Sequence, residues 1–234
     1  MQKIVVANYK MNGSKSFYAS AFKKINNTKV KDTEIVLCPP FVYLNLFKLK
    51  KKNIHLGSQD ISLNVGSKST GQISPAMLKE FKVKYAIIGH SEQRELGETD
   101  EQIAQKAKLC MENNIIPIVC VGEKNKNSSV KEVLCQVEKV FSQIDNTKLF
   151  FAYEPVWAIG SGEVPTKEKI NSVVSLIKQT CNSKCPDVKV LYGGSVNAKN
   201  YKDLLKSEAD GFLIGGASLK IDEFCEIVKG VENE

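Results

Sequence analysis

The chain has 234 residues, of which 42% are hydrophobic and 25% are charged. This balance predicts a folded globular protein and excludes an intrinsically disordered one. The formal net charge of +7 fits a protein that binds nucleic acid or a membrane surface, and it fits equally an enzyme with an anionic substrate. No apolar stretch reaches the roughly 20 residues that a membrane-spanning helix needs, so no membrane partner is expected.

The densest basic run comprises Lys48 and residues 50–52, and it follows the apolar stretch 41–47. We interpret it as the solvated end of a helix, where lysines interact favourably with the negative end of the helix dipole. Aromatic residues are not interleaved with these lysines as they are in RNA-binding motifs. A nucleic-acid partner is therefore not expected.

Cysteine and histidine usage bears on compartment and metal binding. Seven cysteines, an odd number, and an N-terminal sequence unlike a signal peptide favour a reducing, cytoplasmic compartment. Cys181 and Cys185 are four residues apart, but the two histidines, His55 and His90, are distant from them in the sequence. No metal site is expected.

Short apolar runs of strand length recur along the whole chain, separated by amphipathic segments. They are continuously apolar, as strands buried on both faces of a parallel sheet are. The predicted strands are Ile4–Ala7, Ile35–Cys38, Ile54–Gly57, Tyr85–Ile88, Ile115–Val121, Leu149–Tyr153, Val190–Tyr192 and Phe212–Ile214.

The intervening segments carry apolar residues at helical spacing, clearest around residues 17–25, 103–111, 130–141, 170–177 and 221–228. Thr99 with Gln102, and Ser129 with Glu132, have the spacing of a helix capping box. Eight strands alternating with eight helical segments, about 29 residues per unit, predict an α/β fold. We expect one domain, residues 1–234, forming a closed (β/α)₈ barrel of parallel strands ringed by helices.

An open, doubly wound sheet is the alternative architecture. Such a sheet would carry a Gly-x-Gly-x-x-Gly turn after the first strand, where residues 8–13 read Asn-Tyr-Lys-Met-Asn-Gly. The connection 58–74 also departs from the regular pattern, because it is polar and longer than a typical strand-to-helix loop. Loops of this length are usually functional or disordered.

Reactive residues of a (β/α)₈ barrel lie at the carboxyl ends of its strands. These positions hold Asn8 and Lys10 after the first strand, His90 and Ser91 after the fourth, and Glu154 after the sixth. Each alone is more often a solvated or structural residue. Together, a base, a neutral hydrogen-bond donor and a cation suit proton transfer between carbons next to a carbonyl, without a metal or cofactor.

Glycine pairs follow the last two strands, as Gly193-Gly194-Ser195 and Gly215-Gly216. Each pair precedes a predicted helix, and backbone amides at a helix N-terminus bind phosphate. The run 155–162, Pro-Val-Trp-Ala-Ile-Gly-Ser-Gly, is apolar for a surface loop and ends in glycines. It is interpreted as a lid that closes over the bound phosphate and excludes water.

These segments resemble the triosephosphate isomerase family, in the family's order and from one end of the chain to the other. The two most specific are residues 87–94, Ile-Ile-Gly-His-Ser-Glu-Gln-Arg, and residues 153–160, Tyr-Glu-Pro-Val-Trp-Ala-Ile-Gly. The resemblance implies interconversion of dihydroxyacetone phosphate and D-glyceraldehyde 3-phosphate through an enediolate, in glycolysis and gluconeogenesis. It implies no cofactor.

The resemblance also implies roles for individual residues. Glu154 is the base, His90 the electrophile, held neutral by a helix N-terminus as is known for this family, and Lys10 the cation that stabilises the enediolate. Glu92 and Ser91 would contact and orient these residues without contacting the substrate. The remaining implied positions are Asn8, Gly160, Ser195, Gly215 and Gly216 for substrate binding, and Thr70 in a loop that inserts into a second subunit of a homodimer.

The chain departs from the usual family pattern at Tyr9, at Gln93, in the lid's trailing hinge (residues 161–166) and in a shorter segment after Glu123. None of these removes a reacting group.

Two other functions fit the residues at the strand ends less well. Another phosphate-binding barrel, such as an aldolase or an indole-forming synthase, would need a different set of acid and base residues. A non-catalytic barrel would be expected to have lost part of the set Lys10, His90 and Glu154, which is complete in this sequence.

Overall fold

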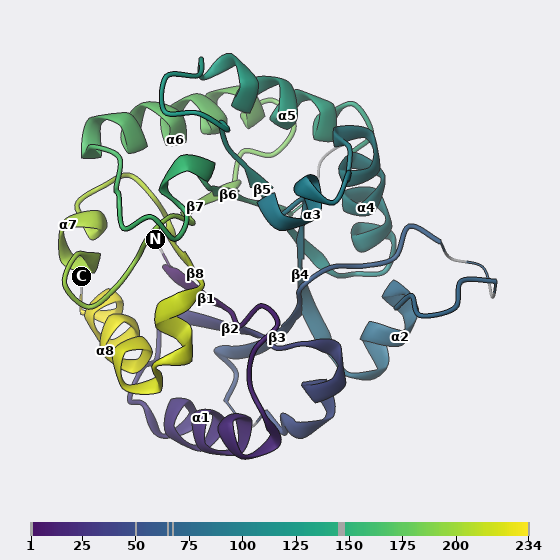
Figure 1. Cartoon of the computed structure of the whole chain (residues 1–234), viewed down its shortest axis with the longest axis vertical. Helices are drawn as coiled ribbons and strands as arrows, with labels where there is room; N and C mark the ends of the chain where they lie inside the picture. Colours follow the sequence, from purple (N-terminus) through teal and green to yellow (C-terminus); the bar gives the residue numbers. More distant parts are fainter. Residues whose placement is uncertain (1, 50, 65, 67, 145–147, 234) are drawn as a thin grey trace.

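The strands close into a single barrel (Figure 1). The computed structural model describes residues 2–49, 51–64, 66, 68–144 and 148–233. Within these ranges eight parallel strands pair in chain order, and pairing of the first strand with the eighth completes the ring. The closed barrel is therefore confirmed and the open sheet is excluded. The strands are β1 (Ile4–Asn8), β2 (Glu34–Cys38), β3 (Ile54–Ser58), β4 (Val83–Ile88), β5 (Ile116–Val121), β6 (Phe150–Tyr153), β7 (Lys189–Tyr192) and β8 (Gly211–Ile214).

Helices surround the barrel and cover its outer face (Figure 1). The α-helices are α1 (Lys15–Asn27), α2 (Pro75–Glu80), α3 (Ser91–Glu95), α4 (Asp100–Glu112), α5 (Lys131–Phe141), α6 (Lys167–Cys181), α7 (Tyr201–Leu205) and α8 (Ile221–Glu232). Three short 3₁₀ helices add η1 (Phe41–Leu46), η2 (Val156–Ala158) and η3 (Gly216–Leu219). The gap after β2 thus holds a 3₁₀ helix where a longer helical segment was predicted, and the described lysines of the basic run lie beyond its end. Lys50 lies outside the described residues.

Two helix starts were predicted from capping boxes, and one of them is wrong. At α4, the side chain of Thr99 accepts a hydrogen bond from the Gln102 amide, and the Gln102 side chain accepts one from the Thr99 amide. At α5, the Ser129 hydroxyl instead accepts from the amide of Lys131, only two residues ahead. This local bond competes with the capping box, so α5 begins after Val130 without a side-chain cap.

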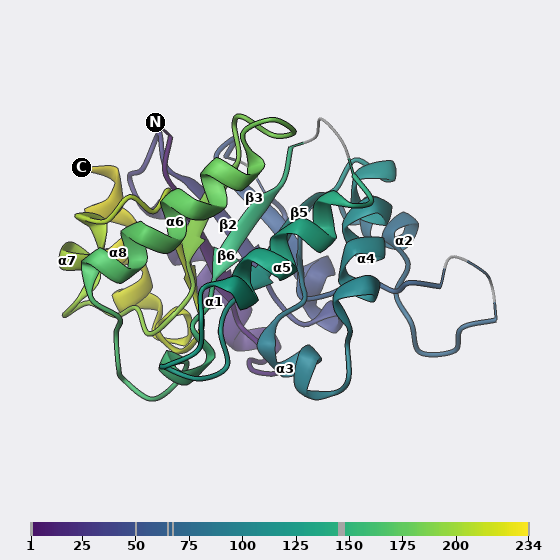
Figure 2. The same cartoon turned by 90° about the horizontal axis from the view of Figure 1, so that it is seen from above.

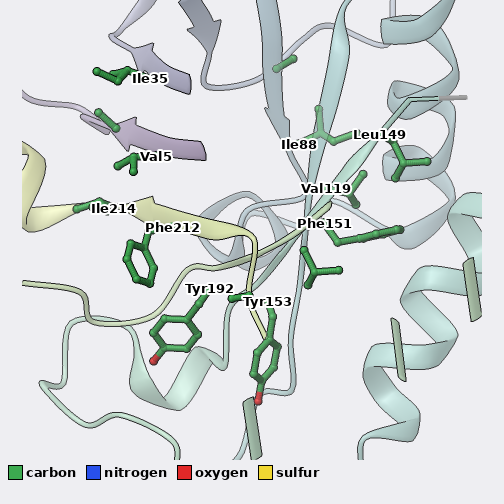
Figure 3. Packing of buried hydrophobic residues seen from close by; sticks show 14 of the residues in the cluster. Val5, Ile35, Ile88, Val119, Leu149, Phe151, Tyr153, Tyr192, Phe212 and Ile214 are labelled. Atoms are coloured by element: carbon green, nitrogen blue, oxygen red, sulfur yellow. The ribbon is translucent and has the colours of Figure 1, made fainter. Parts of the chain in front are cut away.

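The alternating sides of the strands build two separate cores. In β1, Ile4 and Val6 belong to a cluster that consists of strand residues and fills the barrel interior. Val5 and Ala7 belong to the larger cluster between the strands and the helices. Figure 3 shows residues of this outer cluster, among them Val5 on β1, Phe212 on the neighbouring β8, and Phe151 on β6. Burial on both faces explains why the strand sequences are continuously apolar.

Charged and polar side chains form a hydrogen-bonded cluster at the amino-terminal end of the barrel. At the amino ends of the strands, Glu34 accepts a hydrogen bond of 2.8 Å from the Tyr85 hydroxyl and lies 3.4 Å from the Lys84 ammonium. The His55 ring lies 3.6 Å from the same carboxylate. The hydrogen bond with His55, together with Tyr85 and Lys84, lowers the pKa of Glu34 to about 2 against the opposing effect of burial.

The connection from β3 to α2 extends away from the barrel (Figures 1 and 2). Its described residues between Asn64 and Gln72 are mostly exposed, Thr70 among them. The long loop predicted at residues 58–74 is therefore a projection, apart from its first residues, where Ile61 and Ser62 are buried.

None of the helices in the described ranges is long and apolar enough to span a bilayer. The same ranges contain no group of three or more His, Cys, Asp or Glu side chains placed to hold a metal ion.

Candidate active site

A cavity of about 320 Å³ opens at the carboxyl ends of the strands. The three residues predicted to carry the chemistry, Lys10, His90 and Glu154, all line it, and so does Asn8. The predicted phosphate-binding residues Gly160, Ser195, Gly215 and Gly216 line the same cavity. The barrel thus brings together residues that are up to 208 positions apart in the chain, because its closed ring places all strand ends around one centre.

His90 is placed by the helix that follows it. It is the N-cap residue of α3, and its Nδ1 accepts a hydrogen bond of 3.3 Å from the amide of Glu92. An accepting Nδ1 carries no proton, so the neutral ring carries its proton on Nε2. The Nε2 proton therefore points toward the cavity, where Nε2 lies 3.6 Å from Glu154 Oε1.

Glu154 follows β6 directly and is 4% exposed. Its Oε2 is buried and accepts no hydrogen bond from the described residues, so one oxygen is free for a proton. Gly193 at the end of β7 leaves the room for this side chain, since a Cβ there would lie 2.6 Å from Glu154 Cγ. Cys120 lies beside the base. Burial and the Glu154 carboxylate raise the pKa of the Cys120 thiol, which keeps it neutral.

Lys10 adopts a backbone conformation that is unusual for a side-chain-bearing residue, with φ of +49°. Two hydrogen bonds hold it there. The Asn8 Oδ1 accepts from the Lys10 amide at 3.0 Å, and the Gln59 Nε2 donates to the Lys10 carbonyl at 2.8 Å. Strained backbone held by its surroundings is common at functional sites. Gln59 was not predicted, although its position directly after β3 is a strand end like the others.

Glu92 stands between the cation and the imidazole. Its Oε1 accepts a hydrogen bond of 2.6 Å from Lys10 Nζ, and its Oε2 lies 3.7 Å from His90 Nδ1. Burial acts to raise the pKa of Glu92, but the hydrogen bond from Lys10, the neighbouring His90 and the charge of Lys10 together outweigh it, and the pKa is lowered. The Glu92 carboxylate therefore anchors the lysine. Ser91 is buried at the start of α3 and does not line the cavity.

The two glycine pairs differ in their surroundings. Gly215 precedes η3 and Gly216 begins it, so their amides lie at a short helix start as predicted. The pair after β7 is followed by a turn, and α7 begins only at Tyr201. The prediction of a helix N-terminus directly after Gly193-Gly194 is therefore wrong. Ser195 is held instead by its hydroxyl, which donates to the Ala158 carbonyl of the lid at 2.8 Å.

The predicted lid is anchored at its apolar start. Ala158 is fully buried, and the Trp157 indole N–H donates to Glu123 Oε1 over 3.4 Å. The same oxygen accepts a 3.0 Å bond from the Tyr153 hydroxyl. Glu123 is fully buried and was not predicted to contact the lid. No local pattern indicates this contact, since Glu123 and Trp157 are 34 residues apart.

The distal half of the lid is exposed, and Glu163 in its trailing hinge forms an ion pair with the neighbouring loop. Gly160 and Gly162 have φ of +70° and +79°, a conformation that favours glycine. Glu163 Oε2 lies 2.7 Å from Lys126 Nζ, and this ammonium lies 5.1 Å from the centre of the Trp157 ring. Contacts on both sides of the lid's glycines therefore hold it against the segment after β5.

The fold and this cavity define a class of enzyme: a (β/α)₈ barrel whose cavity at the strand ends is lined by a buried carboxylate, an imidazole and an ammonium. Comparison with known proteins narrows the class. The family model described as triosephosphate isomerase matches residues 3–231.

Individual relatives agree over the full length of the chain. The triosephosphate isomerase of Neurospora crassa is 41% identical over 239 residues, which cover 96% of each chain. That of Buchnera aphidicola subsp. Cinara cedri is 38% identical over 251 residues, which cover 98% of each chain. The chain belongs to the triosephosphate isomerase family. This membership confirms the predicted family and enzyme class, a glycolytic isomerase of triose phosphates.

Proposed function

We propose that the chain interconverts dihydroxyacetone phosphate and D-glyceraldehyde 3-phosphate with Glu154 as the base, His90 as the electrophile and Lys10 as the cation. The observation that carries this assignment is the 3.6 Å separation of His90 Nε2 and Glu154 Oε1 across one cavity. A substrate carbon and its carbonyl oxygen placed in that cavity would face the base and the donor together.

In the proposed mechanism Glu154 removes a proton from the carbon next to the carbonyl. The electrons of the broken C–H bond form the enediolate double bond, and the negative charge passes to the oxygen. The Nε2–H of His90 and the ammonium of Lys10 stabilise this oxygen. The hydroxyl proton on the first carbon then passes to the former carbonyl oxygen through Nε2 of His90, and protonated Glu154 returns its proton to the former carbonyl carbon. The carbonyl thereby moves from one carbon to the next, and atoms and charge balance over the cycle without a cofactor.

The other end of the substrate would be held by backbone. We propose that the amides of Gly160, Ser195, Gly215 and Gly216 bind the phosphate, with Asn8 beside Lys10 on the substrate. The hydrogen bond from Ser195 to Ala158 supports this assignment, because it links the phosphate site to the lid. Closure of the lid would exclude water from the enediolate.

The proposed assembly is a homodimer in the cytoplasm, each chain forming one domain. Two features of exposed segments support an interface. Thr70 lies on the projecting β3–α2 connection, and Met11, next to Lys10, is 95% exposed although apolar. An exposed apolar side chain beside the site suits coverage by a second copy. Light scattering coupled to size exclusion would measure the mass, and a monomer at micromolar concentration would contradict the proposal.

A coupled assay in the presence of a metal chelator tests the mechanism. Glu154→Asp shortens the base by one methylene, and a misplacement of about 1 Å lowers the rate by about a hundredfold. Retention of full activity by this variant would exclude Glu154 as the base. Glu168→Asp, a matched change at a residue that does not line the cavity, should leave the rate unchanged.

A further inference from the structure

A carboxylate lines the cavity near its proposed phosphate end. Glu223 lies in the first turn of α8, and its side chain is 18% exposed. A carboxylate repels a phosphate dianion, so its presence in the lining needs another explanation. The contacts of this side chain provide one.

Glu223 joins two segments that follow different strands. Its Oε1 accepts a hydrogen bond of 3.0 Å from the amide of Ala198, in the segment after β7. Its Oε2 lies 3.4 Å from Nζ of Lys220, just before α8, and this ammonium offsets its charge. The carboxylate thus connects the segment after β7 to the segment after β8.

The segment after β7 forms one hydrogen-bonded unit. The Asn200 side chain donates to the Ser195 carbonyl at 2.8 Å and accepts from the Asn197 amide at 2.8 Å. Ala198 lies inside this unit. A bond that fixes Ala198 therefore also restrains the backbone of Ser195.

The carboxyl ends of β7 and β8 are joined by few hydrogen bonds of the sheet. β7 and β8 are paired through one residue pair, Tyr192 with Phe212, whereas β6 and β7 are paired through four. One further backbone bond, from the Asp210 amide just before β8 to the Val190 carbonyl at 2.8 Å, lies at the opposite end of these strands from the cavity. The relative position of Ser195 and Gly215 therefore depends on contacts outside the sheet. Glu223 supplies such a contact.

We propose that Glu223 is a positioning residue of the phosphate site, which holds the segment after β7 against the start of α8. The amides of Ser195, Gly215 and Gly216 then face one phosphate group as a preformed unit. This inference rests on the phosphate-site assignment made above. It adds a residue that touches neither the reacting carbons nor the phosphate.

The test compares Glu223→Ala and Glu223→Gln with Glu226→Ala, an exposed glutamate one turn further along α8. Three quantities are measured: KM for glyceraldehyde 3-phosphate, the inhibition constant of inorganic phosphate, and kcat/KM for glyceraldehyde, which lacks the phosphate. In Glu223→Ala we expect the first two to rise about tenfold, because a loosened site holds phosphate less well. The glyceraldehyde reaction should change by less than about twofold, since it does not use the phosphate site.

The glutamine variant separates positioning from charge. Its amide oxygen still accepts from Ala198, so KM should return to within about twofold of the unchanged protein. Glu226→Ala should match the unchanged protein. Glu223→Asp keeps the charge but loses the reach, and should resemble Glu223→Ala; it gives the same comparison if the alanine variant does not fold.

Three results would overturn the role of Glu223: an unaltered phosphate inhibition constant in Glu223→Ala and Glu223→Asp, an equal loss with glyceraldehyde, or a glutamine variant as weak as alanine. A different result would reject the underlying assignment. If inorganic phosphate does not compete with substrate in the unchanged protein, the phosphate site itself is misassigned, and the inference fails with it.

Discussion

The close approach of β7 to the base yields a quantitative prediction for Gly193→Ala. The new Cβ would lie 2.6 Å from Glu154 Cγ, whereas carbon atoms in contact are separated by about 3.5–4.0 Å. The Gly193 amide donates a hydrogen bond of 2.9 Å to the Tyr153 carbonyl. Because this bond restrains the backbone, we expect the side chain of Glu154 to move instead. The required displacement is about 1 Å.

A displacement of this size should lower kcat by about a hundredfold, or about 2.7 kcal/mol in activation free energy. KM should change little, because the proposed phosphate site is not displaced. Steady-state kinetics in both directions measure this split. Glu226→Ala, at an exposed residue that does not line the cavity, is the control and should match the unchanged protein. Activity of Gly193→Ala within about threefold of the unchanged protein would refute the claim that β7 fixes the base.

Other contacts yield three further predictions. The pKa of Glu34 is lowered to about 2 from an ordinary value of 4.5, so the stabilisation that its carboxylate gives is present above pH 4.5 and is lost as the pH falls toward 2. Glu34→Gln should therefore lower the free energy of unfolding by about 1–2 kcal/mol at pH 7, after allowance for solvent screening, and by less at pH 2.5. Urea titrations at the two pH values measure this difference. Lys126→Ala removes an exposed ion pair, so it should change the free energy of unfolding by less than about 1 kcal/mol. It should nevertheless increase the mobility of the lid, measured by the fluorescence of Trp157, and high salt should produce the same increase in the unchanged protein. Gln59→Ala should lower kcat/KM about tenfold by freeing the strained Lys10 backbone, and an unchanged kcat/KM would contradict that role.

The sequence predicted the strands well, and it predicted residues that the structure brings to one cavity, because both depend on local patterns. Each apolar run falls on a strand to within two residues at either end, and Glu154 and His90 are recognisable from their position after those runs. Contacts between distant loops were not predictable in this way. Glu123 and Glu223 contact partners that follow other strands, and no sequence spacing distinguishes a buried or half-buried glutamate of this kind. The capping box at Ser129 failed for a related reason, since two local hydrogen bonds compete and the sequence does not rank them.

The backbone of Lys10 has a consequence for engineering. A left-handed conformation costs a residue with a Cβ about 1 kcal/mol or more, and glycine avoids this cost. Lys10→Gly should therefore offset much of what is lost with the exposed ion pair to Glu92, and it could fold as well as the unchanged chain while losing catalysis. A search for thermostable variants that selects on folding alone would accept this substitution. At this position, stability and turnover are opposing demands on a single residue.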